Sequence, residues 1–294
     1  MKRRALLGLI GSSIGRSISP AMHEAAGAAL GIDVRYHLID TQELSFGLED
    51  LPHMLDGVRR LGFAGVNVTH PFKEAVAAYL DGLEGAARIV GSVNTIVVRN
   101  GRLIGNNTDH SGFLAGWRRV FGDRKPGRVA LVGAGGVGRA MAHGLAALGC
   151  EKLRVFDLKP ERAAALVQHL RIAHPDLAAT LANDMMTALA DCDGIVNATP
   201  IGSFAYPGLP VPGEGLAGRA WAADAVYTPL ETRFVAAARG ARLAVLTGQE
   251  LAIGQAVDAF ACFFGQPAPA EIMRATFERE LRRGESGLEV ASGR

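Results

Sequence analysis

Short apolar runs alternate along the chain with longer stretches in which apolar residues recur every three or four positions. The short runs are typical of buried strands, and the longer spacing is typical of amphipathic helices. In the first part of the chain this pattern predicts strands at Ala5–Ile10, Val34–Ile39, Phe63–Thr69, Val93–Val98 and Arg102–Ile104. It predicts helices at Ser19–Leu30, Leu48–Leu61 and Pro71–Leu80. Ser19 and Pro20 are expected at the N-cap and the first helical position, and Asn100-Gly101 predicts a hairpin turn.

The polar, turn-rich segment Gly122–Gly127 marks a candidate domain boundary. Beyond it the pattern predicts strands at Arg128–Val132, Leu153–Asp157, Gly194–Asn197, Ala220–Asp224 and Arg242–Leu246. Helices are predicted at Gly136–Leu148, Glu161–His169, Leu251–Phe264 and Pro269–Arg283. Strands that alternate with helices form βαβ units, so the expected fold class is α/β with a parallel sheet.

Composition narrows the classes of function. The 294 residues are enough for about two domains, and 49% hydrophobic with 20% charged residues excludes a mainly disordered chain. A net charge of +2 without a basic stripe, together with 6% aromatic residues, argues against nucleic-acid binding. Nucleic acid is therefore not an expected partner.

Membrane, disulfide and metal signals are also weak. No stretch approaches the ~20 apolar residues of a membrane span, and the apolar run after Arg4 is shorter than that of a secretory signal. Cys150, Cys192 and Cys262 show neither disulfide nor zinc spacing, and the eight histidines form no metal-binding motif. We expect no metal and a reducing cytoplasm, whereas monomer and homodimer both stay open.

A glycine-rich loop lies between the strand Arg128–Val132 and the following helix. Its residues Gly133, Ala134, Gly135, Gly136, Val137 and Gly138 form G-x-G-x-x-G. Gly133 allows the tight turn, Gly135 lets the backbone approach a pyrophosphate, and Gly138 lets the helix pack closely on the sheet. The helix N-terminus adds unpaired N–H groups and a partial positive charge. Dinucleotide binding is therefore predicted.

Asp157 ends the next strand, roughly 20 residues after the glycines, where an acid can hydrogen-bond the adenosine ribose. A carboxylate there repels the 2′-phosphate of NADP, which favours NAD. Lys159 and Arg162 follow, so NADP stays open as an alternative. A structural alternative is that Asp157 only caps the helix that begins near Pro160.

Small polar residues gather where the first strands are predicted to end, which is where ligands bind in open α/β sheets. They are Ser17, Ser19, Asn67, Thr69, Lys73, Asn94, Thr95, Asn107, Thr108 and Asp109. Hydroxyls, amides and an ammonium–carboxylate pair suit a small polyhydroxylated acid. Structural alternatives are that Ser19 and Asp109 cap helices and that Lys73 is a surface residue in a first helical turn. His23 and His70 are expected to be helix-surface or packing residues.

These residues stand in an ordered series of motifs. The series is Ser17–Pro20 (SISP), Asn67–Lys73 (NVTHPFK), Gly91–Thr95 (GSVNT), Gly105–Asp109 (GNNTD), the glycine loop, Asn197–Gly202 (NATPIG), Asp224–Pro229 (DAVYTP) and Gly248–Gln255 (GQELAIGQ). Over nearly the whole chain it resembles the shikimate dehydrogenase family. Gly8–His23, Asp157-Leu158 and Gln255–Phe260 are most similar to the NAD-dependent quinate/shikimate dehydrogenase branch.

The resemblance implies two α/β domains with a cleft between them. Residues 1–110, completed by helices of residues 249–294, would bind substrate, and residues 111–248 would form a Rossmann-type, doubly wound parallel-sheet domain for the dinucleotide. Lys73 and Asp109 match the family's catalytic pair. Its substrate-binding positions match Ser17, Ser19, Thr69, Asn94 and Gln255, with Asn67 beside them and Tyr227 lining the site. Thr199 and Gly248 match positions near the nicotinamide.

The reaction implied is hydride transfer between nicotinamide and the carbon that bears the 3-hydroxyl of shikimate, quinate or a close analogue, giving 3-dehydroshikimate or 3-dehydroquinate. The alternatives are an NADP-dependent biosynthetic shikimate dehydrogenase and a non-catalytic ligand-sensing domain. Two departures from the family pattern, Ser203 and Glu250, bear on substrate choice, and Glu250 would add an acid near the site. Which of Lys73 and Asp109 carries the proton stays open.

Overall fold

The computed structural model describes residues 3–292, with side chains described for residues 3–284, and divides into two compact units. The first unit comprises the chain up to Thr108 and from Ile253 onward, and the second comprises Asp109–Ala252. The chain passes between the units inside two helices, α4 (Thr108–Phe121) and α9 (Gly248–Phe264). Each unit has its own sheet and hydrophobic core.

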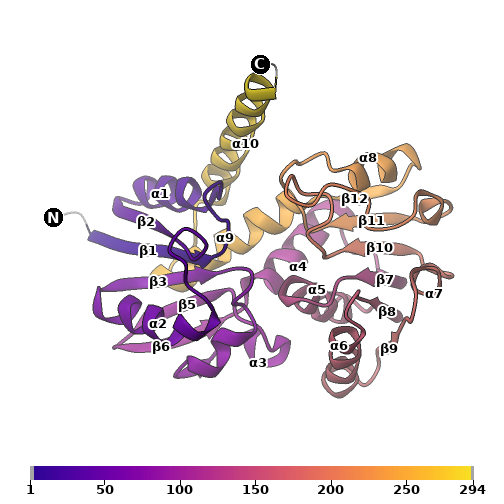
Figure 1. Cartoon of the computed structure of the whole chain (residues 1–294), viewed down its shortest axis with the longest axis horizontal. Coiled ribbons are helices and arrows are strands. Elements are labelled where there is room, and N and C mark those ends of the chain that lie inside the picture. Colours follow the sequence, from indigo (N-terminus) through magenta and orange to yellow (C-terminus); the bar gives the residue numbers. More distant parts are fainter. Residues whose placement is uncertain (1–2, 293–294) are drawn as a thin grey trace. The chain divides into compact units, whose positions relative to one another are not determined.

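The first unit is built on a six-stranded mixed sheet in the order β2-β1-β3-β5-β6-β4 (Figure 1). Its strands are β1 (Arg3–Gly11), β2 (Ile32–Asp40), β3 (Phe63–Val68), β4 (Gly82–Leu83), β5 (Thr95–Arg99) and β6 (Arg102–Asn106). β1 pairs in parallel with β2 and β3, whereas β5 is antiparallel to β3 and β6. The predicted hairpin is confirmed, because Asn100 and Gly101 have φ of 52° and 73°, as a tight hairpin turn requires.

Its helices are α1 (Ser19–Ala29), α2 (Leu51–Arg60), α3 (Ala87–Val90), the later part of α9, and α10 (Ala270–Ser292), which packs on α1. The helix predicted from Pro71 to Leu80 is wrong: a turn leads into a short 3-10 helix, Ala75–Tyr79. One reason is that the carbonyl of Lys73 accepts a hydrogen bond from Val93 N at 2.7 Å instead of closing a helical turn.

The second unit contains a six-stranded sheet in the order β12-β11-β10-β7-β8-β9, with every pair parallel. The strands are β7 (Arg128–Val132), β8 (Lys152–Phe156), β9 (Ala178–Leu181), β10 (Gly194–Asn197), β11 (Trp221–Asp224) and β12 (Ala244–Leu246). This is the doubly wound order, in which the direction of winding reverses between β7 and β10. The sequence pattern did not predict β9, whose outer position leaves two of its four residues exposed.

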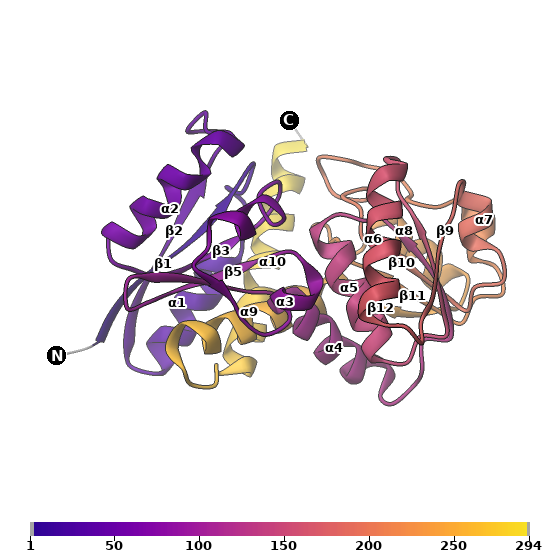
Figure 2. The same cartoon turned by 90° about the horizontal axis from the view of Figure 1, so that it is seen from below.

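Helices cover both faces of this sheet, as alternate residues of β7 show. Val129 and Leu131 belong to the core under α4, α5 (Gly136–Ala147) and α6 (Pro160–Ala173). Ala130 and Val132 belong to the core under α7 (Met185–Leu189) and α8 (Arg233–Gly240). Figure 2 shows α5 and α6 over the first of these faces. The helices α7 and α8 were not predicted from the sequence.

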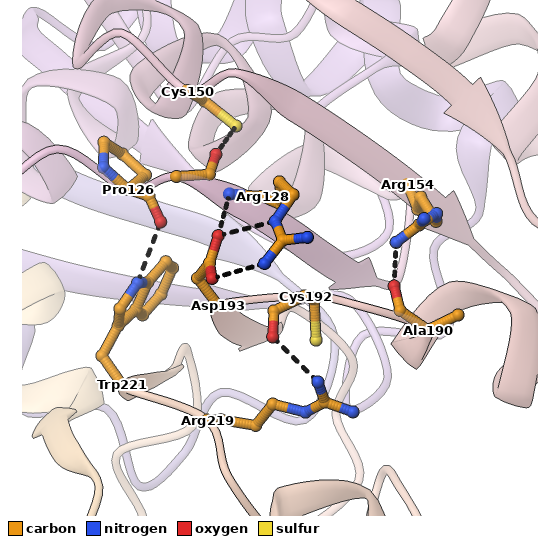
Figure 3. Close-up of polar contacts among 10 residues, drawn as sticks. Pro126, Arg128, Cys150, Arg154, Ala190, Cys192, Asp193, Arg219 and Trp221 are labelled. Atoms are coloured by element: carbon orange, nitrogen blue, oxygen red, sulfur yellow. Dashed lines mark hydrogen bonds and ion pairs between the residues drawn. The ribbon is translucent and has the colours of Figure 1, made fainter.

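The amino ends of the central strands are held by a polar cluster around Asp193 (Figure 3). Its carboxylate accepts hydrogen bonds from Arg128 at N (2.8 Å), Nε (3.0 Å) and Nη2 (2.9 Å). These bonds hold the pKa of Asp193 at about 2, below its ordinary value. Beside them, Trp221 Nε1 donates to the carbonyl of Pro126 at 3.1 Å. The amino ends of β7, β10 and β11 are therefore joined by side-chain hydrogen bonds as well as by the backbone pairing of the sheet.

Gly194 lies against the indole of Trp221, so that an added Cβ would overlap the ring. We expect Gly194→Ala to lower the free energy of unfolding of the second unit by about 1–3 kcal/mol, because the fully buried indole has little room to move. Urea denaturation followed by tryptophan fluorescence reports this unit, since both tryptophans, Trp117 and Trp221, lie in it.

Gly240→Ala is the matched control, because Gly240 ends α8 with nothing within 4 Å of an added Cβ. Its effect should stay within about 1 kcal/mol, in the stabilising direction. Equal urea midpoints for the two variants would contradict the tight packing at Gly194.

Candidate active site

The glycine loop follows β7 and leads into α5. Gly133 has a φ of 101°, and an added Cβ would lie 2.8 Å from the carbonyl carbon of Ala198. A Cβ on Gly138 would overlap the Gly133 carbonyl oxygen, whereas nothing lies within 4 Å of a Cβ on Gly135. The loop is therefore closed on its inner side and open at Gly135, at the N-terminus of α5. That geometry fits a pyrophosphate.

Thr199 lies beside this loop, in the turn that follows β10. Its Cγ2 would be 3.0 Å from a Cβ on Gly133, and its hydroxyl donates to Asn197 Oδ1 at 2.6 Å. The carboxyl ends of β7 and β10 are the point where the winding of the sheet reverses, which is where doubly wound sheets bind ligands. Gly248 begins α9, and a Cβ there would overlap the Val226 carbonyl, so close packing explains this glycine.

Asp157 follows β8 and is tied to the glycine loop. Its Oδ2 accepts a hydrogen bond from Ala134 N at 2.7 Å, and its Oδ1 accepts one from Lys159 N at 2.8 Å. The alternative that Asp157 caps α6 is wrong, because Lys159 is the N-cap and no side chain caps that helix. The carboxylate is instead fixed at the edge of the glycine loop, a bond that sequence spacing did not reveal.

In the first unit, the loop between β1 and α1 carries Ser17. Asp40, at the end of β2, accepts hydrogen bonds from the loop amides of Ser13 (2.9 Å) and Ile14 (2.7 Å). The expected cap by Ser19 is wrong, because Ile18 is the N-cap and makes no side-chain bond. Ser19 N instead donates to Ser17 Oγ at 3.3 Å. No local pattern in the sequence marks Asp40, since only the tertiary structure brings its carboxylate to the loop.

A buried polar network joins the remaining segments of the first unit. Asn67 accepts from Tyr36 Oη at 2.8 Å and donates through Nδ2 to the carbonyl of Asn94 at 3.2 Å and to Thr95 Oγ1 at 3.0 Å. Asn94 Oδ1 in turn accepts from Thr108 N at 2.7 Å. The Asn67 amide therefore holds the Asn94 loop through its nitrogen and is itself held by Tyr36 through its oxygen.

Lys73 belongs to the same set of segments, since its carbonyl accepts from Val93 N. Thr69, four residues earlier, donates its backbone N–H to Ile10 O at 2.9 Å and so lies beside the end of β1. Asp109 directly follows Thr108, is buried, and is the second residue of α4. The alternative that Asp109 is a helix cap is therefore wrong, and so is the first helical turn expected for Lys73.

The other predicted residues lie on three elements. Tyr227 follows β11, and burial, together with the carboxylate of Asp109, raises the pKa of its hydroxyl. Gln255 lies in the part of α9 that belongs to the first unit. Glu250 forms an ion pair with Arg119 of α4 at 3.5 Å, so its carboxylate is engaged within the second unit.

His23 is a packing residue, as expected. Its ring is fully buried and stacks on Tyr36 with centroids 5.0 Å apart and on Phe260 at 6.1 Å. Burial lowers the pKa of His23 to about 3, so the ring is neutral near pH 7. His70 contributes its carbonyl, which accepts from Ser12 N at 3.0 Å.

The described part of the chain shows neither a metal-binding cluster nor a membrane-spanning helix. No three His, Cys, Asp or Glu side chains among the described residues are arranged to hold a metal ion. Between residues 3 and 292, no helix combines the length and the apolar character needed to cross a bilayer.

Comparison with known proteins adds the family to this geometry. The model of the shikimate dehydrogenase substrate binding domain matches residues 9–96, and the model named shikimate / quinate 5-dehydrogenase matches residues 117–203. A shikimate dehydrogenase (NADP(+)) of Streptomyces avermitilis is 45% identical over 263 residues, which are 89% of this chain and 90% of the relative. The chain belongs to the shikimate/quinate dehydrogenase family.

Other members of the family are named for NAD and not for NADP. A quinate/shikimate dehydrogenase (NAD(+)) of Corynebacterium efficiens is 43% identical over 275 residues, covering 92% of this chain and 97% of the relative. The solved quinate dehydrogenase of Corynebacterium glutamicum in complex with NAD is 40% identical, with a TM-score of 0.85 over 94% of this chain and all of that chain (100%). Membership confirms the resemblance, the two-domain α/β fold and an oxidoreductase that acts on a CH–OH group with NAD or NADP.

The carboxylate of Asp40 stabilises the loop that carries Ser17. Burial raises the pKa of Asp40. Hydrogen bonds from the amides of Ile14, Ser13 and Gln42 together lower this pKa by more than burial raises it, so that it lies below the ordinary value of 3.8. Asp40→Asn would place an amide N–H against a backbone N–H, at a cost of about 1–3 kcal/mol in the free energy of unfolding at pH 7. Because the folded-state pKa is lowered, the stabilisation is complete above pH 3.8 and disappears as the pH falls through the folded-state value.

Hydrogen exchange of the 12–18 segment at pH 7, with circular dichroism across pH 2–7, measures both effects. Asp33→Asn on the same strand is the control, since Asp33 only pairs at the surface with Arg4 (3.5 Å) and Arg35 (3.2 Å). Equal exchange in the two variants would show that Asp40 does not hold the loop.

Proposed function

We propose that this protein is an NAD-dependent dehydrogenase that transfers a hydride between nicotinamide and the carbon bearing the 3-hydroxyl of shikimate or quinate. The observation that carries the proposal is the set of buried hydrogen bonds that joins the segments of Lys73, Asn94 and Thr108, directly before Asp109. A lysine side chain that accepts the proton as a neutral amine, a carboxylate and an amide, on segments held in this way, are the groups needed to bind and deprotonate a hydroxyl.

The preference for NAD rests on Asp157. Each oxygen of its carboxylate accepts one backbone N–H and keeps a further lone pair for a ribose hydroxyl. A 2′-phosphate at that position would meet a fixed negative charge. The NAD-dependent Corynebacterium relatives support this choice. NADP is the second candidate, since Lys159 and Arg162 follow Asp157 and the Streptomyces relative is named for NADP.

The substrate is proposed to bind to the first unit. Hydroxyl and amide groups that can hydrogen-bond the ring hydroxyls and the carboxylate of a polyhydroxylated acid are assigned to Ser17, Ser19, Thr69, Asn94, Tyr227 and Gln255. Asn67 is assigned a supporting role, because both ends of its amide are bonded within the protein. Thr199 and Gly248 are assigned to the nicotinamide side of the site.

In this proposal Lys73 takes the proton of the 3-hydroxyl as hydride leaves the same carbon, and returns it in the reverse reaction. Asp109 hydrogen-bonds the hydroxyl and orients the amine. Nicotinamide, when bound, supplies the hydride chemistry itself. The residues of the chain therefore provide position, orientation and proton transfer.

Lys73→Ala should lower kcat by about 10²–10⁴-fold, because it removes the proton acceptor but not the backbone carbonyl that holds Val93. Shikimate or quinate should still bind, as isothermal titration would show. Initial rates are measured for each acid with NAD and with NADP, with Lys125→Ala at an exposed lysine as the control. Near-normal kcat in Lys73→Ala would remove Lys73 from the mechanism, and no turnover of either acid by the native chain would overturn the proposed function.

The double variant Asp157→Ser with Leu158→Arg should raise the ratio of kcat/KM for NADP over NAD by about tenfold or more, since it replaces a repelling charge by an attracting one. Leu158→Arg alone separates the added cation from the lost carboxylate. An unchanged ratio in the double variant would mean that the ribose is recognised elsewhere.

A further inference from the structure

Asp224 is a buried acid that the proposed mechanism does not use. It ends β11, and its side chain has 0% exposure. Oδ1 accepts hydrogen bonds from Asn197 Nδ2 (2.9 Å) and Val226 N (3.0 Å), and Oδ2 accepts one from Thr232 Oγ1 (2.6 Å). Burial raises the pKa of Asp224 to about 6. Burying a carboxyl group costs free energy, and the raised pKa shows that the three hydrogen bonds offset only part of that cost.

Asn197, which ends the neighbouring strand β10, connects this acid to the next turn. Its Oδ1 accepts from both Thr199 N (3.1 Å) and Thr199 Oγ1 (2.6 Å). Its Nδ2 donates to Asp224 and also to the carbonyl of Ile201 at 3.0 Å. The turn after β10 is therefore folded around a single amide group, and Asp224 is, among the described residues, the one acceptor of that amide that lies outside the turn.

That turn packs directly on the glycine loop. A Cβ on Gly133 would lie 2.8 Å from Ala198 and 3.0 Å from Thr199, and a Cβ on Gly138 would lie 3.4 Å from the Ala198 Cβ. The loop and the turn thus approach more closely than any side chain on Gly133 would allow. A shift of the turn by even a fraction of an ångström must move the loop or open a gap beside it.

We propose that Asp224 is a positioning residue for dinucleotide binding, acting through Asn197 to hold the Thr199 turn against the glycine loop. This inference rests on the proposed function for its ligand but not for its substrate. The hydrogen-bond acceptor at Oδ1, rather than the negative charge, is the required feature. A neutral amide can present its oxygen to Asn197 and Val226 while its nitrogen donates to Thr232 Oγ1.

The test is the dissociation constant of NADH, measured by fluorescence titration without substrate. Asp224→Leu should weaken NADH binding by about tenfold or more, since it leaves Val226 N without its acceptor and Asn197 Nδ2 with the Ile201 carbonyl alone. Asp224→Asn should bind NADH within about threefold of the native chain. Thr232→Val removes the hydrogen bond that orients the Asp224 carboxylate, so it should weaken binding by less than Asp224→Leu does, and Thr232→Ser, which keeps the hydroxyl, should bind NADH as the native chain does.

Asp193→Asn is the control for loss of stability alone. Asp193 lies directly before β10, at the opposite end of that strand from the glycine loop, where its carboxylate is bonded to Arg128 (Figure 3). This variant should melt at a lower temperature and bind NADH as the native chain does.

Unchanged NADH binding in Asp224→Leu and Thr232→Val, with lowered melting temperatures, would overturn the inference and leave Asp224 a structural residue. Equal loss of binding in Asp224→Asn and Asp224→Leu would overturn the assignment to the acceptor. A native chain that binds NADH but oxidises neither shikimate nor quinate would remove the substrate assignment alone, because the titration needs no turnover.

Discussion

Buried side-chain acceptors at the ends of strands hold the loops on which the rest of the structure depends. Asp40 binds the amides of the loop that carries Ser17, Asn94 binds the start of α4, and Asn197 binds the turn that contains Thr199. A loop backbone without such partners would be bonded mainly to water and would sample many conformations. A short Asp or Asn side chain removes that freedom while it occupies little volume.

The two sheets use this device in different ways. In the second unit the doubly wound order brings the carboxyl ends of β7 and β10 together, and the glycines allow the two backbones to approach one another. Asp157 and the Asp224–Asn197 pair then fix the loop from two sides. In the first unit the antiparallel pair β5–β6 brings the Asn94 loop beside Thr108, and Asn67 links it to Tyr36. In our proposal, phosphate binding and polyol binding thereby rest on separate networks, which is consistent with two units that each have their own core.

This arrangement separates stability from chemistry along each strand of the second unit. The amino ends carry the Asp193–Arg128 bonds and the packed indole of Trp221, which join strands and bind no ligand in our proposal. The carboxyl ends carry the glycine loop, Asp157 and the Thr199 turn. A buried carboxyl such as Asp224 is unfavourable for stability near pH 7, because burial raises its pKa to about 6. In our proposal its function is to position the Thr199 turn.

The sequence by itself determined the element types of the long, periodic segments, the hairpin at Asn100-Gly101, the glycine loop and the family, because these depend on local spacing and on the residue types that a turn requires. It failed for the segment after Pro71, where a distant amide, Val93 N, binds the Lys73 carbonyl. It also failed for the helix cap expected at Ser19 and for short elements such as β9. Only the tertiary structure showed that Asp40 and Asn67 bond neighbouring loops, that Asp224 bonds Asn197, and that Glu250 pairs with Arg119. The physical reason is that a hydrogen bond between residues far apart in the chain depends on which strands lie side by side, and no local pattern of residues contains that information.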